Sequence, residues 1–158
     1  MPTPYEIQVA IAALIKATVP DARVIGRNVL GELEIGNWSV LHDTTGKVHG
    51  WFVSQRADNW QELDSGPGYA GYVLEFDVWQ VYRYESGNDT TNSEKEFADE
   101  RELVKAAFTS GLPSELTWAD PLTFPEIGLF PRQAQNRLPV HIAKGIGKVK
   151  LKTGANCP

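Results

Sequence analysis

Residues 72–84 read YVLEFDVWQVYRY, and residues 93–108 read SEKEFADERELVKAAF. The first stretch is rich in aromatic and β-branched residues and is much longer than an average strand of about five or six residues. The second stretch repeats apolar residues three and four positions apart, which is typical of a helix with one buried side. One long strand followed by one helix is the pattern that decides the fold.

The long strand has two faces of different character, because successive side chains of a strand point to opposite sides of its sheet. One face is predicted to be the core face and is interrupted only by Gln80. It carries Tyr72, Leu74, Phe76, Val78, Tyr82 and Tyr84. The other face mixes valines and charged residues with Trp79, which suits neither a dry core nor a simple solvated surface. We interpret this second face as a partner surface.

Two capping boxes are expected to open the two main helices. Thr3 with Glu6 precedes a helical stripe over residues 4–18, and Ser93 with Glu96 would open the helix at 93–108. Further strands are predicted at Leu33, Ile35 and 38–41, at 48–53, and at 138–152 with a bulge at Gly145 and Gly147. Residues 58–71 and 112–137 are expected to be long irregular loops. The sequence therefore predicts an α+β fold, with a largely antiparallel sheet and two main helices packed on one face.

The length of 158 residues suits a single domain, 1–158, with a core from about residue 4 to 152 and a frayed tail at 153–158. The single cysteine, Cys157, stands next to the end and has no partner for an internal disulfide, which favours folding in the cytoplasm. The first residues match neither a signal peptide nor a membrane span, so we expect a soluble protein without a membrane partner.

Charge is unevenly distributed along the chain. No acidic residue follows Glu126, whereas six of the 15 basic residues do, so the first 126 residues carry nine basic and 20 acidic side chains. The formal charge is −11 before that point and +6 after it. Such asymmetry can hold neighbouring subunits in register or bring the basic part to an acidic partner. The alternative is an exposed strand edge that lysines protect from aggregation.

Few residues suggest chemistry. The three histidines, His42, His49 and His141, lack the close spacing of zinc ligands, so neither a metal nor a cofactor is expected. Glu75 and Asp77 share a face of the long strand, an arrangement that a pair of acid/base carboxylates could use. Ion pairing with a neighbouring strand or subunit is the favoured interpretation. We therefore expect that the protein is not an enzyme.

The candidate interface residues combine tryptophans with the terminal lysines, because tryptophan is favoured as a buried anchor at protein interfaces. They are Trp60, Trp79, Trp118, Lys148, Lys150 and Lys152. For Trp60 and Trp118, both in expected loops, intramolecular packing is an equally good interpretation.

Several stretches together resemble the tail terminator and tail-completion proteins of tailed bacteriophages, which lie at the head–tail junction. The resemblance runs over roughly residues 4–151. Its parts are the amino-terminal helix, HGWFVSQR at 49–56, the strand at 72–84, the helix start Ser93-Glu94-x-x-Phe97 and the closing strand with His141-Ile142-Ala143.

The resemblance implies a virion protein, assembled in the host cytoplasm, whose subunits form a ring, typically a hexamer, on the last ring of the tail tube. Such a ring stops tube growth and meets the head connector, while DNA passes through its bore without sequence-specific binding. Loops around Trp60 and 121–131 would contact tube or connector, and the lysines at 148–152 an acidic neighbour. The alternatives are another neck protein, either a connector adaptor or a stopper, or a small cytoplasmic enzyme or ligand-binding domain that uses Glu75 and Asp77 with a histidine.

Overall fold

The computed structural model describes residues 3–56, 61–63, 71–109, 116–130 and 139–151. Its elements in chain order are α1 (Pro4–Thr18), β1 (Arg23–Ile25), α2 (Leu30–Glu34), the 3-10 helix η1 (Trp38–Leu41), β2 (His49–Gln55), β3 (Gln61–Leu63), β4 (Gly71–Arg83), α3 (Ser93–Ala107), β5 (Leu116–Phe130) and β6 (Val140–Leu151).

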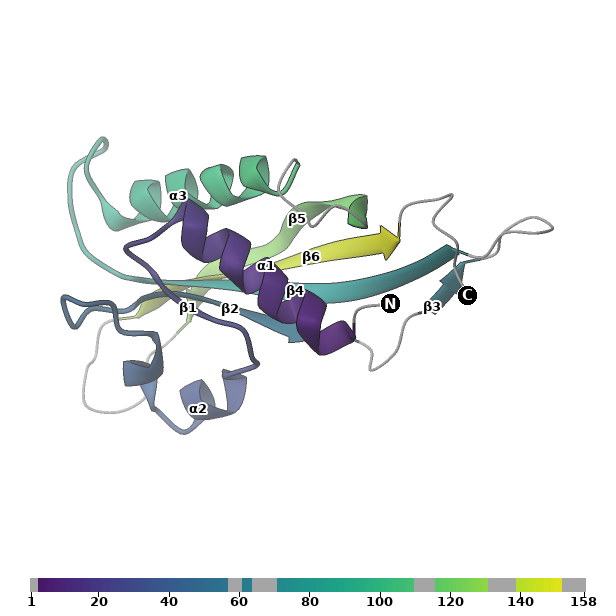
Figure 1. Cartoon of the computed structure of the whole chain (residues 1–158). Helices are drawn as coiled ribbons and strands as arrows, with labels where there is room; N and C mark the ends of the chain where they lie inside the picture. Colours follow the sequence, from purple (N-terminus) through teal and green to yellow (C-terminus); the bar gives the residue numbers. More distant parts are fainter. Residues whose placement is uncertain (1–2, 57–60, 64–70, 110–115, 131–138, 152–158) are drawn as a thin grey trace.

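The strands form one sheet in the order β1-β2-β4-β6-β5, and β3 also pairs with β4. All pairs are antiparallel except β1 with β2. The two long helices, α1 and α3, lie on one side of the sheet and the short α2 lies on the other (Figure 1). The predicted α+β class, with a largely antiparallel sheet and two main helices on one face, is confirmed.

The long strand β4 occupies the centre of the sheet. Its register with β2 runs from His49 opposite Tyr82 to Gln55 opposite Phe76, and β6 pairs with it along 11 positions on its other side. A strand paired along both edges can satisfy its backbone hydrogen bonds over its whole length, which explains why so long a strand is stable here.

The face of the sheet under α1 and α3, called here the helix face, carries the even-numbered residues of β4. Its core joins Leu74, Phe76 and Val78 to apolar residues of β2, α1 and α3, which are Trp51, Val53, Ile7, Ile11, Ile15, Val104 and Phe108. Gln80 interrupts this face as the sequence indicated, and it is fully buried. Its side-chain amide donates a hydrogen bond of 2.9 Å to the carbonyl oxygen of Phe97.

The opposite face, called here the α2 face, carries the odd-numbered residues of β4. A second apolar cluster covers part of it, where α2, η1 and the turn before them pack on Phe52, Val81 and Val140. Further along β4 the same face bears charged residues instead. One part of the α2 face is therefore buried in an apolar core, and the other part carries charged side chains.

The two main helices begin where the sequence predicted, but only one begins with the predicted cap. Thr3 and Glu6 form the capping box of α1. At α3 the cap is Asn92, whose side chain accepts a hydrogen bond from the backbone of Lys95. The predicted capping box at Ser93 is wrong, because the Ser93 hydroxyl binds the backbone of Glu85 instead.

The strands predicted at Leu33, Ile35 and 38–41 are wrong, because this segment forms α2 and η1. Gly36 has a φ of 86° and follows α2, where glycine tolerates the left-handed conformation that ends a helix. The amide of Asn37 binds the carbonyl of Glu32, which closes this turn. Five residues are too few for a helical period to stand out from a short alternating run.

The loop predicted at 112–137 is also wrong in part, because it contains β5. Pro121 and Pro125 break the strand pattern, but β5 pairs only with β6 among the described strands, and an edge strand tolerates proline. The register between β5 and β6 shifts three times between Trp118 and Glu126. The irregularity expected in β6 therefore lies in β5, while β6 keeps a continuous register with β4. The loop predicted at 58–71 likewise contains β3.

Candidate interaction surface

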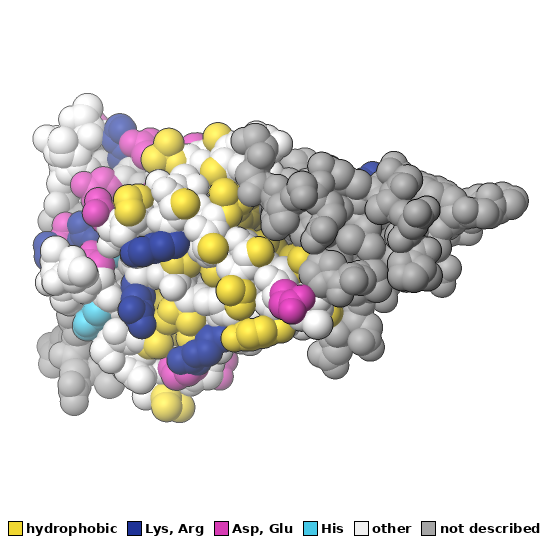
Figure 2. Space-filling model, viewed as in Figure 1, with side chains coloured by type: hydrophobic (Ala, Val, Ile, Leu, Met, Phe, Trp, Pro, Cys, Tyr) yellow, Lys and Arg dark blue, Asp and Glu magenta, His cyan; other side chains and the backbone are white. Residues whose placement is uncertain are grey.

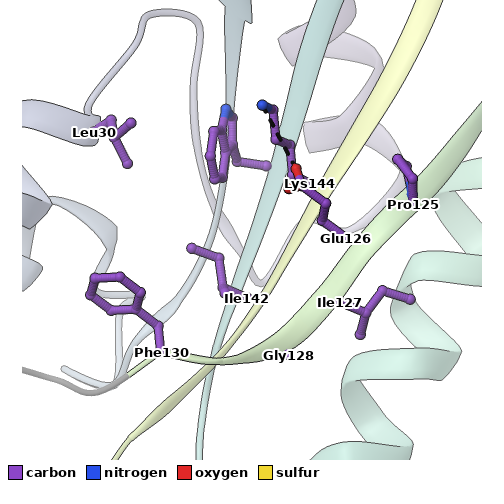
Figure 3. Close-up of a pocket in the computed structure, with 9 residues that line it drawn as sticks. Leu30, Pro125, Glu126, Ile127, Gly128, Phe130, Ile142 and Lys144 are labelled. Carbon is purple, nitrogen blue, oxygen red and sulfur yellow. Dashed lines mark ion pairs between the residues drawn. The ribbon is translucent and has the colours of Figure 1, made fainter.

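A hollow of about 570 Å³ opens on the α2 face between α2 and β5. We call it the β5 hollow. It is lined by Leu30, Trp79, Pro125, Glu126, Ile127, Gly128, Phe130, Ile142 and Lys144. Figure 3 looks into it: Leu30 lies across from Phe130 and Ile142, and Lys144 reaches toward Glu126. Most of these side chains are apolar, so the hollow presents apolar surface next to a single ion pair.

Trp79 has a fixed position in this hollow. Its indole stacks on Phe52 of β2, with ring centroids 5.5 Å apart and planes within 8°. The Nζ atom of Lys144 lies 5.3 Å from the centroid of the Trp79 ring and 3.7 Å from a carboxylate oxygen of Glu126. A cation near an aromatic ring contributes about 0.5–1 kcal/mol at an exposed site. Trp79 and Lys144 therefore form one wall of the hollow, with the Trp79 ring held in place by its contacts.

The end of β5 adds further apolar surface. Ile127, Leu129 and Phe130 are 56%, 54% and 39% exposed. Phe130 packs near Trp38 on the α2 face, whereas Ile127 and Leu129 stand opposite Ala143 and His141, which belong to the helix face. Exposed apolar side chains at a sheet edge are candidates for contact with another molecule.

The remaining part of the α2 face carries ion pairs between strands. Glu75 lies 3.2 Å from Lys148, and Asp77 lies 2.6 Å from Arg56. The expected ion pairing of these two carboxylates is confirmed. His49 and His141 both stand opposite Tyr82, on the helix face, so neither can join Glu75 and Asp77 in an acid/base site.

The structure places three of the six residues proposed from the sequence on one face of the sheet, but only Trp79 lines the hollow. Trp79, Lys148 and Lys150 lie on the α2 face, since they occupy paired positions of β4 and β6. Trp118 lies in β5, opposite Val149. Trp60 and Lys152 lie outside the described residues. The sequence did not predict the hollow itself. Lys144 lies an even number of residues from Lys148 and Lys150 in the predicted strand, so strand alternation could have placed Lys144 on the same face as those two lysines.

A second polar group lies on the helix face and ties α3 to β2. The Nε2 atom of His49 is 2.5 Å from Glu100, and its Nδ1 atom is 3.5 Å from Asp43. The indole of Trp51 donates to the other oxygen of Glu100 at 2.6 Å. Burial would raise the pKa of Asp43, but hydrogen bonds from Thr45 and the backbone, together with nearby His49, lower the pKa below its usual value. These contacts hold α3 against β2.

Tyr82 and His141 extend that polar group. The Tyr82 hydroxyl donates to Glu96 at 2.6 Å, and burial followed by this bond raises the pKa of Tyr82. His141 lies 2.9 Å from the hydroxyl of Ser93, and burial lowers the pKa of His141 although Glu94 opposes the shift. Ser93 and His141 are 2% and 6% exposed. A serine and histidine so enclosed fasten the start of α3.

In the part of the chain that the structure describes, no three acidic, histidine or cysteine side chains are grouped to hold a metal ion. None of the helices described is both long and apolar enough to span a membrane. No model of a known protein family matches this chain, and no curated protein shows significant similarity to it.

Proposed function

We propose that this protein is a structural virion subunit of a tailed bacteriophage, which forms a ring at the head–tail junction, ends the tail tube and joins it to the head connector. The observation that carries the proposal is the β5 hollow with the exposed apolar end of β5 beside it. This surface is suited to binding a protein partner. The resemblance of the chain to tail terminator proteins supplies the biological setting.

A ring needs two different surfaces on each subunit, because each subunit contacts one neighbour with one side and the next neighbour with the other. The uneven charge supports this arrangement, since the chain before Glu126 is acidic and the chain after it is basic. The net charge of −5 also suits a bore through which DNA slides, because affinity for phosphate rises with the number of cationic contacts.

The partners in this proposal are further copies of the chain, in a hexamer, together with the tail tube protein and the connector proteins of the head. The assembled ring belongs to the virion, and the subunits fold in the host cytoplasm. A connector adaptor or stopper would make different contacts from the same ring architecture. An enzyme that uses Glu75 and Asp77 is less well supported, because both carboxylates are held by cations.

Electron microscopy of the purified protein at rising concentration, alone and with tail tubes, tests the proposal. We expect closed rings with a bore wide enough for a DNA duplex, and a ring capping one end of each tube. Growth of tubes from purified tube protein should stop when the rings are added. Rings that bind the connector but never the tube would move the protein to another neck position. Tubes that stay bare and keep growing would contradict the proposal.

A further inference from the structure

We infer that neighbouring subunits of the ring contact each other through α3 and the β5 hollow, with Leu103 of one subunit entering the hollow of the next. The inference rests on the proposed ring and names the contact that builds it. The partner that covers the hollow is thus a second copy of this chain.

Leu103 is the exposed apolar residue of α3. The helix packs on the sheet through Phe97, Val104 and Phe108, which are buried, whereas Leu103 is 59% exposed. Its neighbours Asp99 and Glu102 have side chains that are 61% and 67% exposed. Acidic and basic side chains lie next to one another at the left of Figure 2, where α3 starts. The outer side of α3 therefore offers one large apolar side chain beside two carboxylates that pair with Lys95 and Lys105.

The β5 hollow has a similar character, apolar with paired charges. Trp79, Ile142 and Phe130 supply apolar surface, and Lys144 and Glu126 are the charged side chains in the lining. Lys144 is paired with Glu126 only at 3.7 Å, and the Asp99 and Glu102 carboxylates are paired with lysines of their own helix in exposed geometry. Exposed ion pairs contribute little, so these groups can exchange partners at low cost. Their charges then orient the two subunits.

The positions of the two surfaces make the contact repeat around a ring. The α3 helix covers the helix face, whereas the hollow opens on the α2 face, so the two surfaces lie on opposite sides of the sheet (Figure 1). A contact between different surfaces passes from subunit to subunit, and it closes into a ring when the rotation between neighbours divides a full turn. Ile35 is more exposed, at 83%, but it adjoins α2, which also supplies Leu30 to the hollow. Insertion of Ile35 into the hollow of a second subunit would favour a two-fold dimer, because Ile35 and the hollow lie at the same place on each subunit.

Two variants can disable the two halves of this contact separately. Leu103→Asp removes the inserted side chain at an exposed position. Gly128→Phe fills the hollow, and a Cβ atom built at Gly128 has no neighbour within 4 Å, so the fold has room for it. We expect each variant alone to self-associate at least about tenfold more weakly than the unmodified chain, as measured by sedimentation velocity. An equimolar mixture should form a one-to-one pair and nothing larger, because only one intact contact remains.

The control is Ile35→Ser, which should assemble like the unmodified chain. Assembly by Leu103→Asp or Gly128→Phe at unmodified strength overturns the inference, as does an unmodified chain that stays monomeric at every concentration. Loss of assembly in the Ile35 variant alone would indicate the two-fold dimer instead. Should Gly128→Phe fail to fold, a charge exchange replaces it: Lys144→Glu should weaken assembly, and adding Glu102→Lys in the same chain should restore it.

The same variants separate this contact from the proposed function. Rings that need Leu103 and the hollow but never bind tail tubes keep the contact and contradict the tail-terminating role. A Leu103→Asp variant that still caps tubes as rings keeps the role and overturns the contact.

Discussion

Buried polar residues of the helix face have partners on other elements, as burial of polar groups requires, although the Oε1 atom of the buried Gln80 has no hydrogen-bond partner among the described residues. Glu100 is the clearest case, since one carboxylate of α3 meets both the imidazole of His49 and the indole of Trp51. Without that carboxylate, the indole N–H of Trp51 and the Nε2 atom of His49 would lose their partner. The polar group therefore specifies where α3 sits on the sheet.

Glu100→Ala is expected to lower the free energy of unfolding by about 2–4 kcal/mol, because it leaves two buried donors without an acceptor. Urea unfolding followed by circular dichroism measures the change. Asp99→Ala is the matched control on the same helix, and losing its exposed ion pair with Lys95 should cost less than about 0.5 kcal/mol. Equal losses in the two variants would show that Glu100 does not hold α3 in place.

His141 should make stability depend on pH. Burial lowers the pKa of His141 from its ordinary value of 6.5, so below that pH the unfolded chain binds a proton more readily than the folded chain. This contribution to stability is complete above pH 6.5 and is lost as the pH falls through the lowered pKa of the folded state. Unfolding free energies at pH 7.5 and 5.5, compared between the unmodified chain and His141→Gln, measure it.

The Gln variant is expected to be less stable at pH 7.5 by about 1–2 kcal/mol, because its fit against Phe97 and Ser93 is poorer. Its stability should then fall less than that of the unmodified chain on acidification. A fall of the same size in both proteins would assign the pH dependence to other groups.

At the scale of the elements, local signals explain what could be predicted. The helix over 4–18 and the strand over 72–84 each show a periodic pattern over many residues. The structure places α1 and β4 within one residue of those bounds. The short α2 and the proline-containing β5 have no such period, so their positions depend on packing that sequence reasoning cannot see. Two walls of the β5 hollow come from these two elements. Of the residues that line the hollow, only Trp79 was among the predicted interface residues.

Gly145 allows β5 to lie against β6 despite its shifted register. A Cβ atom at this position would be 2.7 Å from the ring of Phe124, which also packs edge-on against Trp51. Gly145→Ala is therefore expected to cost about 1–3 kcal/mol in thermal or urea unfolding, because the ring cannot move freely.

Gly128→Ala is the control for that variant, because the added methyl group meets nothing within 4 Å, and its effect should stay within about 0.5 kcal/mol. Phe124→Leu in the Gly145→Ala background should recover part of the loss. An unchanged stability of Gly145→Ala would show that β5 adjusts its path without cost.

At the scale of the whole molecule, the basic strand β6 is the feature through which the proposed assembly can be tested. Lys144, Lys148 and Lys150 all lie on the α2 face, opposite β4 positions that alternate between apolar and acidic. Lys148 reaches Glu75 while its side chain stays 40% exposed. A partly exposed row of cations can meet a second chain without first breaking the core.

Replacing Lys148, Lys150 and Lys152 together by glutamate is expected to weaken assembly at least about tenfold while the monomer stays folded, because like charges would then face the acidic part of the neighbour. Circular dichroism checks that the monomer stays folded, and sedimentation velocity measures the strength of assembly. The same charge change at Arg23, Arg27 and Lys47, none of which lies in β6, is the control and should assemble nearly as the unmodified chain does. Added salt should weaken the unmodified assembly, since it screens exposed charges. If the triple variant assembles normally and salt has no effect, the lysines protect a strand edge and the asymmetry of charge does not direct assembly.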